Sequence, residues 1–262
     1  MLQTSYEGLT VERRDEGVVL ITIVGHGPMN SVDNEIHDAM NAIWRDIDAD
    51  PSVLVAVITG AGQVFSAGGN LEQWGDALGN SEEAMRTFTL ATGLIENLIN
   101  CGKPIISAIN GPAVGVALAI ALLADISIVG ESAKLGDGHV RIGLPAGDHA
   151  VIIWPLLCGL AQSKYYLLTG ELIGGPEAAR IGLVTKCVSD DAVLSEALTI
   201  ASRLARGPKW ALYGTKRSLN HWLRQAGPSF EYSATVEVLG MFGNEAREGL
   251  NSFLEKRRPH FE

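Results

Sequence analysis

Four runs of apolar, often β-branched residues constrain the fold of this chain more than any other feature. They lie in the first half of the sequence, at Val18–Val24, Val53–Thr59, Pro104–Ile109 and Ile126–Val129. Each run is too continuous for a strand with one face in water, so each is predicted to be an interior strand. Helical patterns separate the runs, and the longest of them covers Ser81–Asn100. Strands separated by helices pair in parallel, so the sequence predicts an α/β fold built from βαβ units.

The chain changes character after Asp148, where helical patterns follow one another and only Val184–Val188 looks extended. From about Ala201 onward the helices carry more large apolar side chains than a solvent-facing tail needs. These side chains are Trp210, Trp222, Phe230, Met241, Phe242 and Phe253. The pattern predicts a core domain over residues 1–200 and a C-terminal helical region over residues 201–262 that contacts a sister subunit.

Composition and charge exclude several classes of function. The 262 residues are 47% hydrophobic, which suits a globular protein with a large core. A formal net charge of −10 argues against nucleic-acid and anionic-membrane partners, because both need a basic face. No run of 18 apolar residues and no secretory signal pattern are present, so a cytoplasmic protein is expected. The three cysteines are far apart and lack metal-ligand spacing, which favours reduced thiols and no metal site.

Two glycine-rich loops are the first candidates for chemistry. The segment GAGQVFSAGGNL, residues 60–71, follows the second strand, and NGPAVGVALA, residues 110–119, follows the third. In both, small residues precede a helix start, where free backbone N–H groups point outward. Two convergent amides can stabilise a thioester oxygen as it becomes an enolate or an oxyanion. Either loop alone is better explained as a tight turn, because short glycine motifs are common.

These loops, with LTGELIGGPEAARIGLVTKCV at residues 168–188 and EGLNSFLEKRRPHF at residues 248–261, resemble the crotonase superfamily, also called the enoyl-CoA hydratase/isomerase family. The resemblance covers nearly the whole chain. It implies a spiral of βαβ units with a C-terminal helical layer, an acyl-CoA substrate, no further cofactor, and homotrimers or dimers of trimers. By position, the two oxyanion amides fall on Gly69 and Val116, although the family usually has glycine where Val116 stands.

The same resemblance assigns the coenzyme A part of the substrate to two segments. The backbone of the first loop is expected to hold the adenine and phosphates, and basic residues near the C-terminus can reach the phosphates. These residues are Ser66, Ala67, Gly68, Leu71, Lys256 and Arg257. The basic pair is equally well explained as a solvated helix end that the helix dipole favours.

The chain departs from the family at its acids. Hydratases of this family carry two glutamates that share a water, one acting as base and one as acid. The matching positions of this chain hold Ala119 and His139, so neither carboxylate is present. Ordinary hydration of an enoyl thioester would need another proton path.

A histidine and an aspartate stand in the loop DGHVRIGLPAGDH, where His139 precedes Asp148 by nine residues. A carboxylate bound to one imidazole nitrogen fixes the tautomer and makes the other nitrogen a better base. The loop resembles the superfamily branch of 6-oxocamphor hydrolase, which cleaves β-diketones and uses a glutamate on a late helix, here Glu237 by position. Alternatively, His139 is a turn residue and Asp148 a helix N-cap. Asp137 is expected only to cap or solvate the loop, and His149 to occupy a first helical turn.

Three functions remain open. The first is an enzyme that acts on an acyl-CoA thioester, with the amides of Gly69 and Val116 and a base pair formed by His139 and Asp148. The second is a retro-Claisen hydrolase of a β-diketone or a β-ketoacyl-CoA. The third is a crotonase-fold binding protein without catalysis, which the missing glutamates permit.

Overall fold

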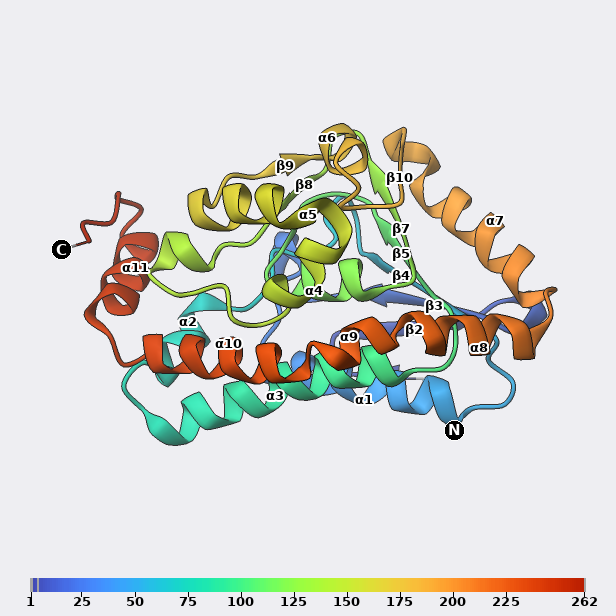
Figure 1. Cartoon of the computed structure of the whole chain (residues 1–262), viewed down its shortest axis with the longest axis horizontal. Coiled ribbons are helices and arrows are strands. Elements are labelled where there is room, and N and C mark those ends of the chain that lie inside the picture. Colours follow the sequence, from blue (N-terminus) through green and yellow to red (C-terminus); the bar gives the residue numbers. More distant parts are fainter. Residues whose placement is uncertain (1, 4, 262) are drawn as a thin grey trace.

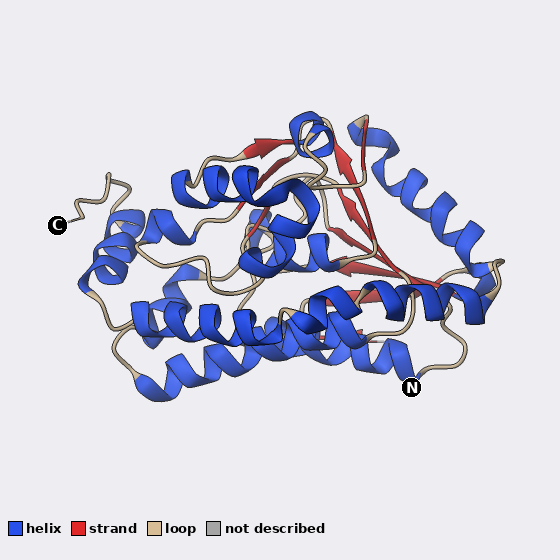
Figure 2. Cartoon of the chain, viewed as in Figure 1, coloured by secondary structure: helices blue, strands red, loops and turns tan. Residues whose placement is uncertain are grey.

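The structure is a computed structural model that describes residues 2–3 and 5–261. A seven-stranded sheet forms its centre, and helices cover both faces of the sheet (Figures 1 and 2). The strands, in spatial order, are β1 (Ser5–Tyr6), β2 (Leu9–Arg13), β3 (Val18–Ile23), β4 (Val55–Gly60), β5 (Ile105–Ile109), β7 (Ile126–Gly130) and β10 (Lys186–Val188). Pairing is antiparallel from β1 to β3 and parallel from β3 to β10. The predicted α/β architecture with parallel interior strands is confirmed.

A small second sheet joins strands that flank the candidate site. Its members are β6 (Ala113–Val114), β8 (Lys134–Gly136) and β9 (Ile173–Gly174), with β8 in the middle. The helices are α1 (Asn34–Ala49), α2 (Leu71–Trp74), α3 (Ser81–Asn100), α4 (Val116–Leu123), α5 (Ala150–Thr169), α6 (Gly175–Arg180), α7 (Val193–Ala205), α8 (Lys209–Leu219), α9 (His221–Gln225), α10 (Gly227–Gly240) and α11 (Asn244–Leu254). Short 3₁₀ turns are η1 (Asp15–Gly17), η2 (Gly27–Met29), η3 (Gly75–Ala77), η4 (His139–Ile142) and η5 (Asp190–Ala192).

Alternate side chains of the central strands reach two different helical layers. On one face, Val57 and Ile106 pack with Ala197 of α7. On the other face, Ile58 and Leu94 belong to the larger core that includes α1, α3 and α4. Successive side chains of a strand point to opposite faces of the sheet. A sheet with helices on both faces therefore needs apolar residues at odd and even positions of its strands. This double burial explains the continuous apolar runs in the sequence.

The C-terminal helices fold back over the rest of the chain. Lys216 of α8 is buried, and its Nζ lies 2.8 Å from Asp125 Oδ2 and donates to the carbonyl of Lys103 at 2.7 Å. Further along, α10 lies against α3 and α5 (Figure 1). The last helices therefore bring side chains from residues beyond 201 to the middle of the protein.

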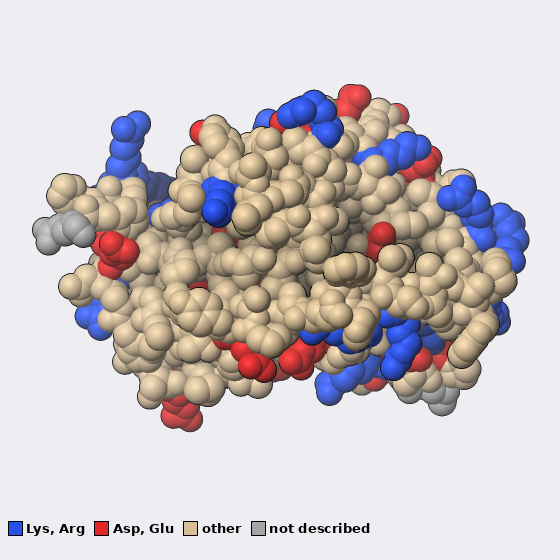
Figure 3. Space-filling model, viewed as in Figure 1, with Lys and Arg blue, Asp and Glu red and all other residues tan. Residues whose placement is uncertain are grey.

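The helix α5 is long and apolar enough to cross a membrane by length and composition. Its backbone leaves the helical region at Gly159, where φ is 78°, so it consists of two shorter helices in series. Leu156, Leu160 and Leu168 are exposed on it, and the surface over α5 and α10 is largely uncharged (Figure 3). An exposed apolar surface of this kind is typical of a subunit interface.

Candidate active site

The two glycine-rich loops lie side by side. Ser66 and Ala113 form a parallel bridge, in which the N–H of Val114 donates to the carbonyl of Ser66 at 3.1 Å. Gly68 has φ of 87°, and a Cβ there would lie 2.5 Å from the carbonyl oxygen of Val114. Only glycine allows this backbone conformation together with such a close approach. The sequence SAGG is therefore what lets the first loop meet the second.

Two backbone amides of these loops are free. Within residues 2–3 and 5–261, the N–H groups of Gly69 and Val116 donate to no other group. Val116 is the first residue of α4, and Gly115 before it has φ of 56°. A Cβ at Gly69 or Gly115 would meet nothing within 4 Å, so space in front of both loops is open. Free N–H groups at a helix start suit a developing oxyanion.

Of the other first-loop residues that were expected to bind coenzyme A, Ser66 and Ala67 already form hydrogen bonds within the chain. Ser66 is buried, and its Oγ donates to the carbonyl of Asn30 and accepts the N–H of Gly68. The N–H of Ala67 donates to Met29. Leu71 begins α2 and is partly buried.

At the C-terminus, the guanidinium of Arg257 contacts Glu248 and Glu255 at 2.5 to 2.7 Å. These two carboxylates raise the pKa of Arg257 above its ordinary value. Lys256 is exposed and has φ of 54°. Of the basic pair, only Lys256 keeps its charge free of a carboxylate in the described part of the chain.

The loop around His139 adjoins the second amide. Strand β6 pairs with β8, and the N–H of Gly115 donates to the carbonyl of Gly136 at 3.4 Å. Asp137 follows directly and accepts the backbone N–H of His139 at 3.1 Å and its Nδ1 at 2.9 Å. The aspartate thus closes an Asx turn and also fixes the imidazole ring. Asp137 was expected only to cap or solvate the loop; the turn agrees with the capping part of that expectation, and the bond to the imidazole was not predicted.

Glu237 of α10 approaches the same imidazole from the opposite side. Its Oε1 lies 3.4 Å from Nε2 of His139, and its Oε2 accepts the N–H of Gly147 at 3.1 Å. Ser233, one turn earlier on α10, donates to the carbonyl of Gly147 at 2.7 Å. The structure thus brings together His139 and Glu237, which lie 98 positions apart in the sequence.

The expected bond between Asp148 and His139 is corrected by the structure. Oδ1 of Asp148 accepts the backbone N–H of His149 at 2.6 Å and its Nδ1 at 2.7 Å, while Asp137 takes the place beside His139. Closing a contact over two residues costs less chain entropy than closing one over nine. Asp148 still lies close, since ligand atoms of His139, Asp148 and Glu237 are all within 4.8 Å of one another.

Burial and charge act against each other in this cluster. Burial lowers the pKa of His139, but the carboxylates of Asp137, Glu237 and Asp148 outweigh it and hold the pKa well above its ordinary value. Burial raises the pKa of Glu237, and the other two carboxylates add to this rise against the opposing effect of His139. At neutral pH the site therefore holds an imidazolium next to a carboxyl group whose proton affinity is enhanced. Such a pair can exchange a proton.

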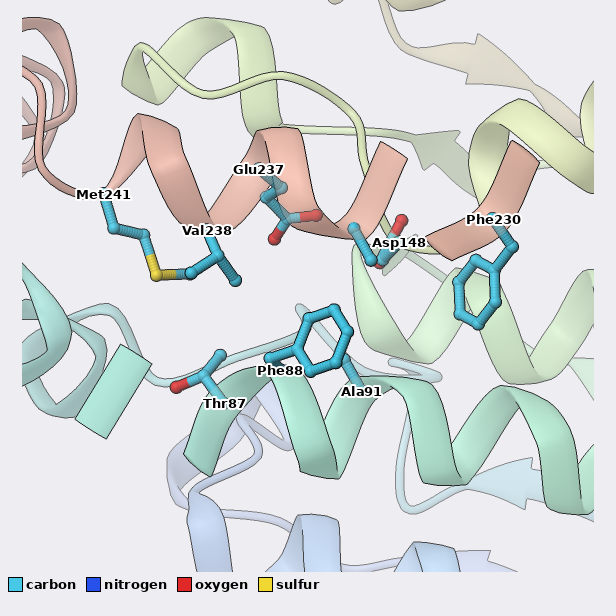
Figure 4. A pocket seen from close by; sticks show the side chains of 9 residues that line it. Thr87, Phe88, Ala91, Asp148, Phe230, Glu237, Val238 and Met241 are labelled. Atoms are coloured by element: carbon cyan, nitrogen blue, oxygen red, sulfur yellow. The ribbon is translucent and has the colours of Figure 1, made fainter. Parts of the chain in front are cut away.

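A narrow pocket opens beside the cluster, between α3 and α10 (Figure 4). Asp148 and Glu237 line it from one side, and Phe88 and Ala91 of α3 face them. Its other lining residues are Thr87, Phe230, Ala234, Val238 and Met241. The pocket thus combines an apolar wall with two acidic groups, and its volume of about 10 Å³ has room for about one water molecule.

Two sets of side chains have ligand atoms near enough to hold a metal ion. They are His139, Asp148 and Glu237, and Asp137, Asp148 and His149. In both sets the imidazoles already bond to carboxylates, so proton transfer is an equally complete use of the same atoms.

A spiral of βαβ units with two glycine loops side by side defines a protein of the crotonase fold. The chain belongs to the enoyl-CoA hydratase/isomerase family, whose sequence model matches residues 13–262. A probable enoyl-CoA hydratase of Rhodobacter capsulatus is 32% identical over 250 residues, which cover 94% of this chain and 95% of that protein. This relationship supports the expectation of an enzyme.

Solved structures agree with this assignment. An enoyl-CoA hydratase/isomerase of Mycobacterium paratuberculosis has a TM-score of 0.89 and 30% identity, covering 96% of this chain and 99% of that one. A β-diketone hydrolase of the cyanobacterium Anabaena, bound to (S)-3-oxocyclohexyl acetic acid, has a TM-score of 0.85 and 26% identity, covering 91% and 95%. The resemblance to the β-diketone-cleaving branch is thereby supported in part.

Proposed function

We propose that the chain hydrolyses a carbon–carbon bond between two carbonyl groups, a retro-Claisen cleavage of a β-dicarbonyl substrate. The observation that carries this proposal is the contact between His139 and Glu237, backed by Asp137, because His139 stands at one of the two glutamate positions of family hydratases. Ala119, at the other glutamate position, is buried and apolar. A histidine and a late-helix glutamate thus replace the paired acids that hydration uses.

The reaction divides between these groups as follows. Glu237 accepts a proton from water, and the hydroxide adds to one carbonyl carbon, whose oxygen becomes an oxyanion bound by the amides of Gly69 and Val116. The carbon–carbon bond then breaks, and its electron pair moves onto the second carbonyl as an enolate. His139 donates its Nε2 proton to the enolate carbon. Because Nε2 lies 3.4 Å from Glu237 Oε1, the proton taken from water can return to His139. One β-diketone and one water give a ketone and a carboxylic acid.

Two further observations support this assignment. The raised pKa of Glu237 makes it a stronger base, and the raised pKa of His139 keeps an acid beside it at neutral pH. The pocket wall is apolar apart from Thr87 and the two acids, and its volume of about 10 Å³ suits the water from which Glu237 would take a proton. The similar Anabaena protein is a β-diketone hydrolase.

The second candidate is hydration or isomerisation of an acyl-CoA thioester. The free amides of Gly69 and Val116 and the similarity to probable enoyl-CoA hydratases favour it. In that case His139 and Glu237 would serve in place of the two glutamates. Against it, Arg257 is neutralised by Glu248 and Glu255 and offers little charge to a phosphate.

A substrate panel tests these alternatives directly. Purified protein is assayed with cyclic and acyclic β-diketones, β-ketoacyl-CoA and enoyl-CoA, each beside the Glu237→Gln variant. Retro-Claisen activity predicts carboxylic acid release from a β-diketone and its loss in the variant. Turnover of enoyl-CoA alone would replace the proposal with the second candidate. Binding without turnover of any compound would identify an inactive binding protein.

A further inference from the structure

The second histidine of the site, His149, is fully buried at the start of α5. Its Nδ1 lies 2.7 Å from Oδ1 of Asp148, while its Nε2 is buried and has no hydrogen-bond partner in the described part of the chain. A carboxylate only accepts hydrogen bonds, so the proton sits on Nδ1 and Nε2 is a bare acceptor.

The bonds from His149 divide the two oxygens of Asp148 into different roles. Oδ1 receives both the backbone N–H and the Nδ1 proton of His149. Oδ2 accepts no hydrogen bond from any described residue. Asp148 nevertheless lines the pocket between α3 and α10, close to His139 and Glu237. One oxygen is thus anchored and the other is left for the site.

We propose that His149 is a positioning residue: it holds Asp148 as a carboxylate and leaves the free oxygen of that carboxylate facing the pocket, where it stabilises the protonated form of His139. This role rests on the retro-Claisen function proposed above. The site then has two histidine–aspartate pairs. In the first, Asp137 orients the imidazole of His139, and in the second, His149 orients the carboxylate of Asp148.

A purely structural role accounts less well for a histidine side chain at position 149. The backbone N–H of His149 alone already satisfies Oδ1 at 2.6 Å. An imidazole with an unpaired buried nitrogen costs about 1–3 kcal/mol, and a leucine would fill the space without that cost. The side chain is therefore better explained by what its Nδ1 does to Asp148.

The charge balance at Asp148 agrees with this role. Five titratable side chains face it from the elements packed around it: His37 of α1, Asp137 before η4, His139 of η4, His149 at the start of α5 and Glu237 of α10. Burial raises the pKa of Asp148, but the hydrogen bonds from the side chain and backbone of His149, together with the charge of His139, outweigh this and hold the pKa below its ordinary value. Without His149, burial and the two neighbouring acids would act against His139 alone.

Three substitutions at one position test the proposal. The side-chain amide of asparagine reaches where Nδ1 of histidine lies, whereas the amide of glutamine reaches where Nε2 lies. His149→Asn should therefore keep near wild-type kcat, while His149→Gln and His149→Leu lower kcat by about 10- to 100-fold with KM little changed, as when a partner that orients a functional side chain is removed. In the last two variants the alkaline limb of the pH profile should move to lower pH, because an Asp148 carboxylate that is no longer held in place stabilises the protonated form of His139 less.

A second measurement keeps this inference separate from the proposed function. Carboxyl-carbon NMR of ¹³C-aspartate-labelled protein, with Asp148→Asn to assign the signal, follows the titration of Asp148 without any substrate. His149→Gln should raise its midpoint relative to wild type, and His149→Asn should not. An unchanged midpoint in His149→Gln would overturn the inference, as would equal kcat in the Asn and Gln variants. A wild-type protein inactive on all β-diketones would instead refute the function, and the NMR result would still decide the role of His149.

Discussion

Gly147 holds the helix that carries Glu237 against the loop that carries Asp148. A Cβ at this position would lie 2.3 Å from the carbonyl oxygen of Ser233 and 2.5 Å from Cβ of Glu237, whereas ordinary contacts begin at 3.4 Å. In Gly147→Ala, α10 must therefore retreat by about 1 Å, a displacement that typically costs about 100-fold in rate when it misplaces a reacting group. Two hydrogen bonds to Gly147 also weaken, at about 1 kcal/mol each.

The assay is kcat and melting temperature, measured together on the substrate that the panel identifies. Gly214→Ala is a matched control, because Gly214 lies in the interior of α8 and its Cβ would meet nothing within 4 Å. That variant should keep its rate and gain up to about 1 kcal/mol of stability from the better helix former. Near wild-type kcat and stability in Gly147→Ala would refute the reasoning that this contact positions Glu237.

The other predictions concern single groups and the assembly. His139→Ala should abolish turnover. In the wild type, activity should fall at acid pH as Glu237, whose pKa is raised, takes up a proton, and at alkaline pH as His139, whose pKa is also raised, loses one. A rate independent of pH from 4 to 9 would contradict this. Val116→Gly should leave kcat within about tenfold, since the amide donor survives, whereas loss of a donor costs about 100-fold. Burial lowers the pKa of His37 from 6.5 to about 4, so below pH 6.5 the unfolded state binds more protons than the folded state. About 3 kcal/mol of stability should therefore be lost as the pH falls from 6.5 to about 4. Denaturant titrations of His37→Phe should lack this loss. Sedimentation should show a trimer-based oligomer that Leu160→Glu with Leu168→Glu dissociates, and a wild-type monomer at micromolar concentration would oppose this.

The interior of the fold could be predicted from the sequence because burial on both faces leaves a continuous apolar run. All four interior strands were found within two residues at either end, and α3 matched its predicted bounds. The strand Leu9–Arg13, which lies next to the edge of the sheet, was not predicted, since most of its side chains are exposed and only Leu9 and Val11 show an apolar alternation. The strands of the small sheet have two or three residues each, too few for any period to show.

The candidate site, like the fold, could be predicted from the sequence only in part. Gly69 and Val116 were assigned through the family resemblance, and the loop and helix start that carry them are local features that a sequence can show. The partner of His139 could not, because sequence spacing does not say whether Asp137 turns back on the ring or Asp148 reaches across. Glu237 was placed by family position alone, since its contact with His139 arises only when α10 packs over the core.

The position of Glu237 on α10 has a consequence for how the protein matures on the ribosome. The loops that hold the two amides, and the turn that holds His139, are synthesised well before residue 237. A growing chain can thus fold its sheet and expose a carbonyl-binding loop while lacking the carboxyl group that would act on a bound carbonyl compound. If Glu237 acts as proposed, the site is complete only once α10 has docked, so the folding of helices α8 to α11 decides when the active site forms.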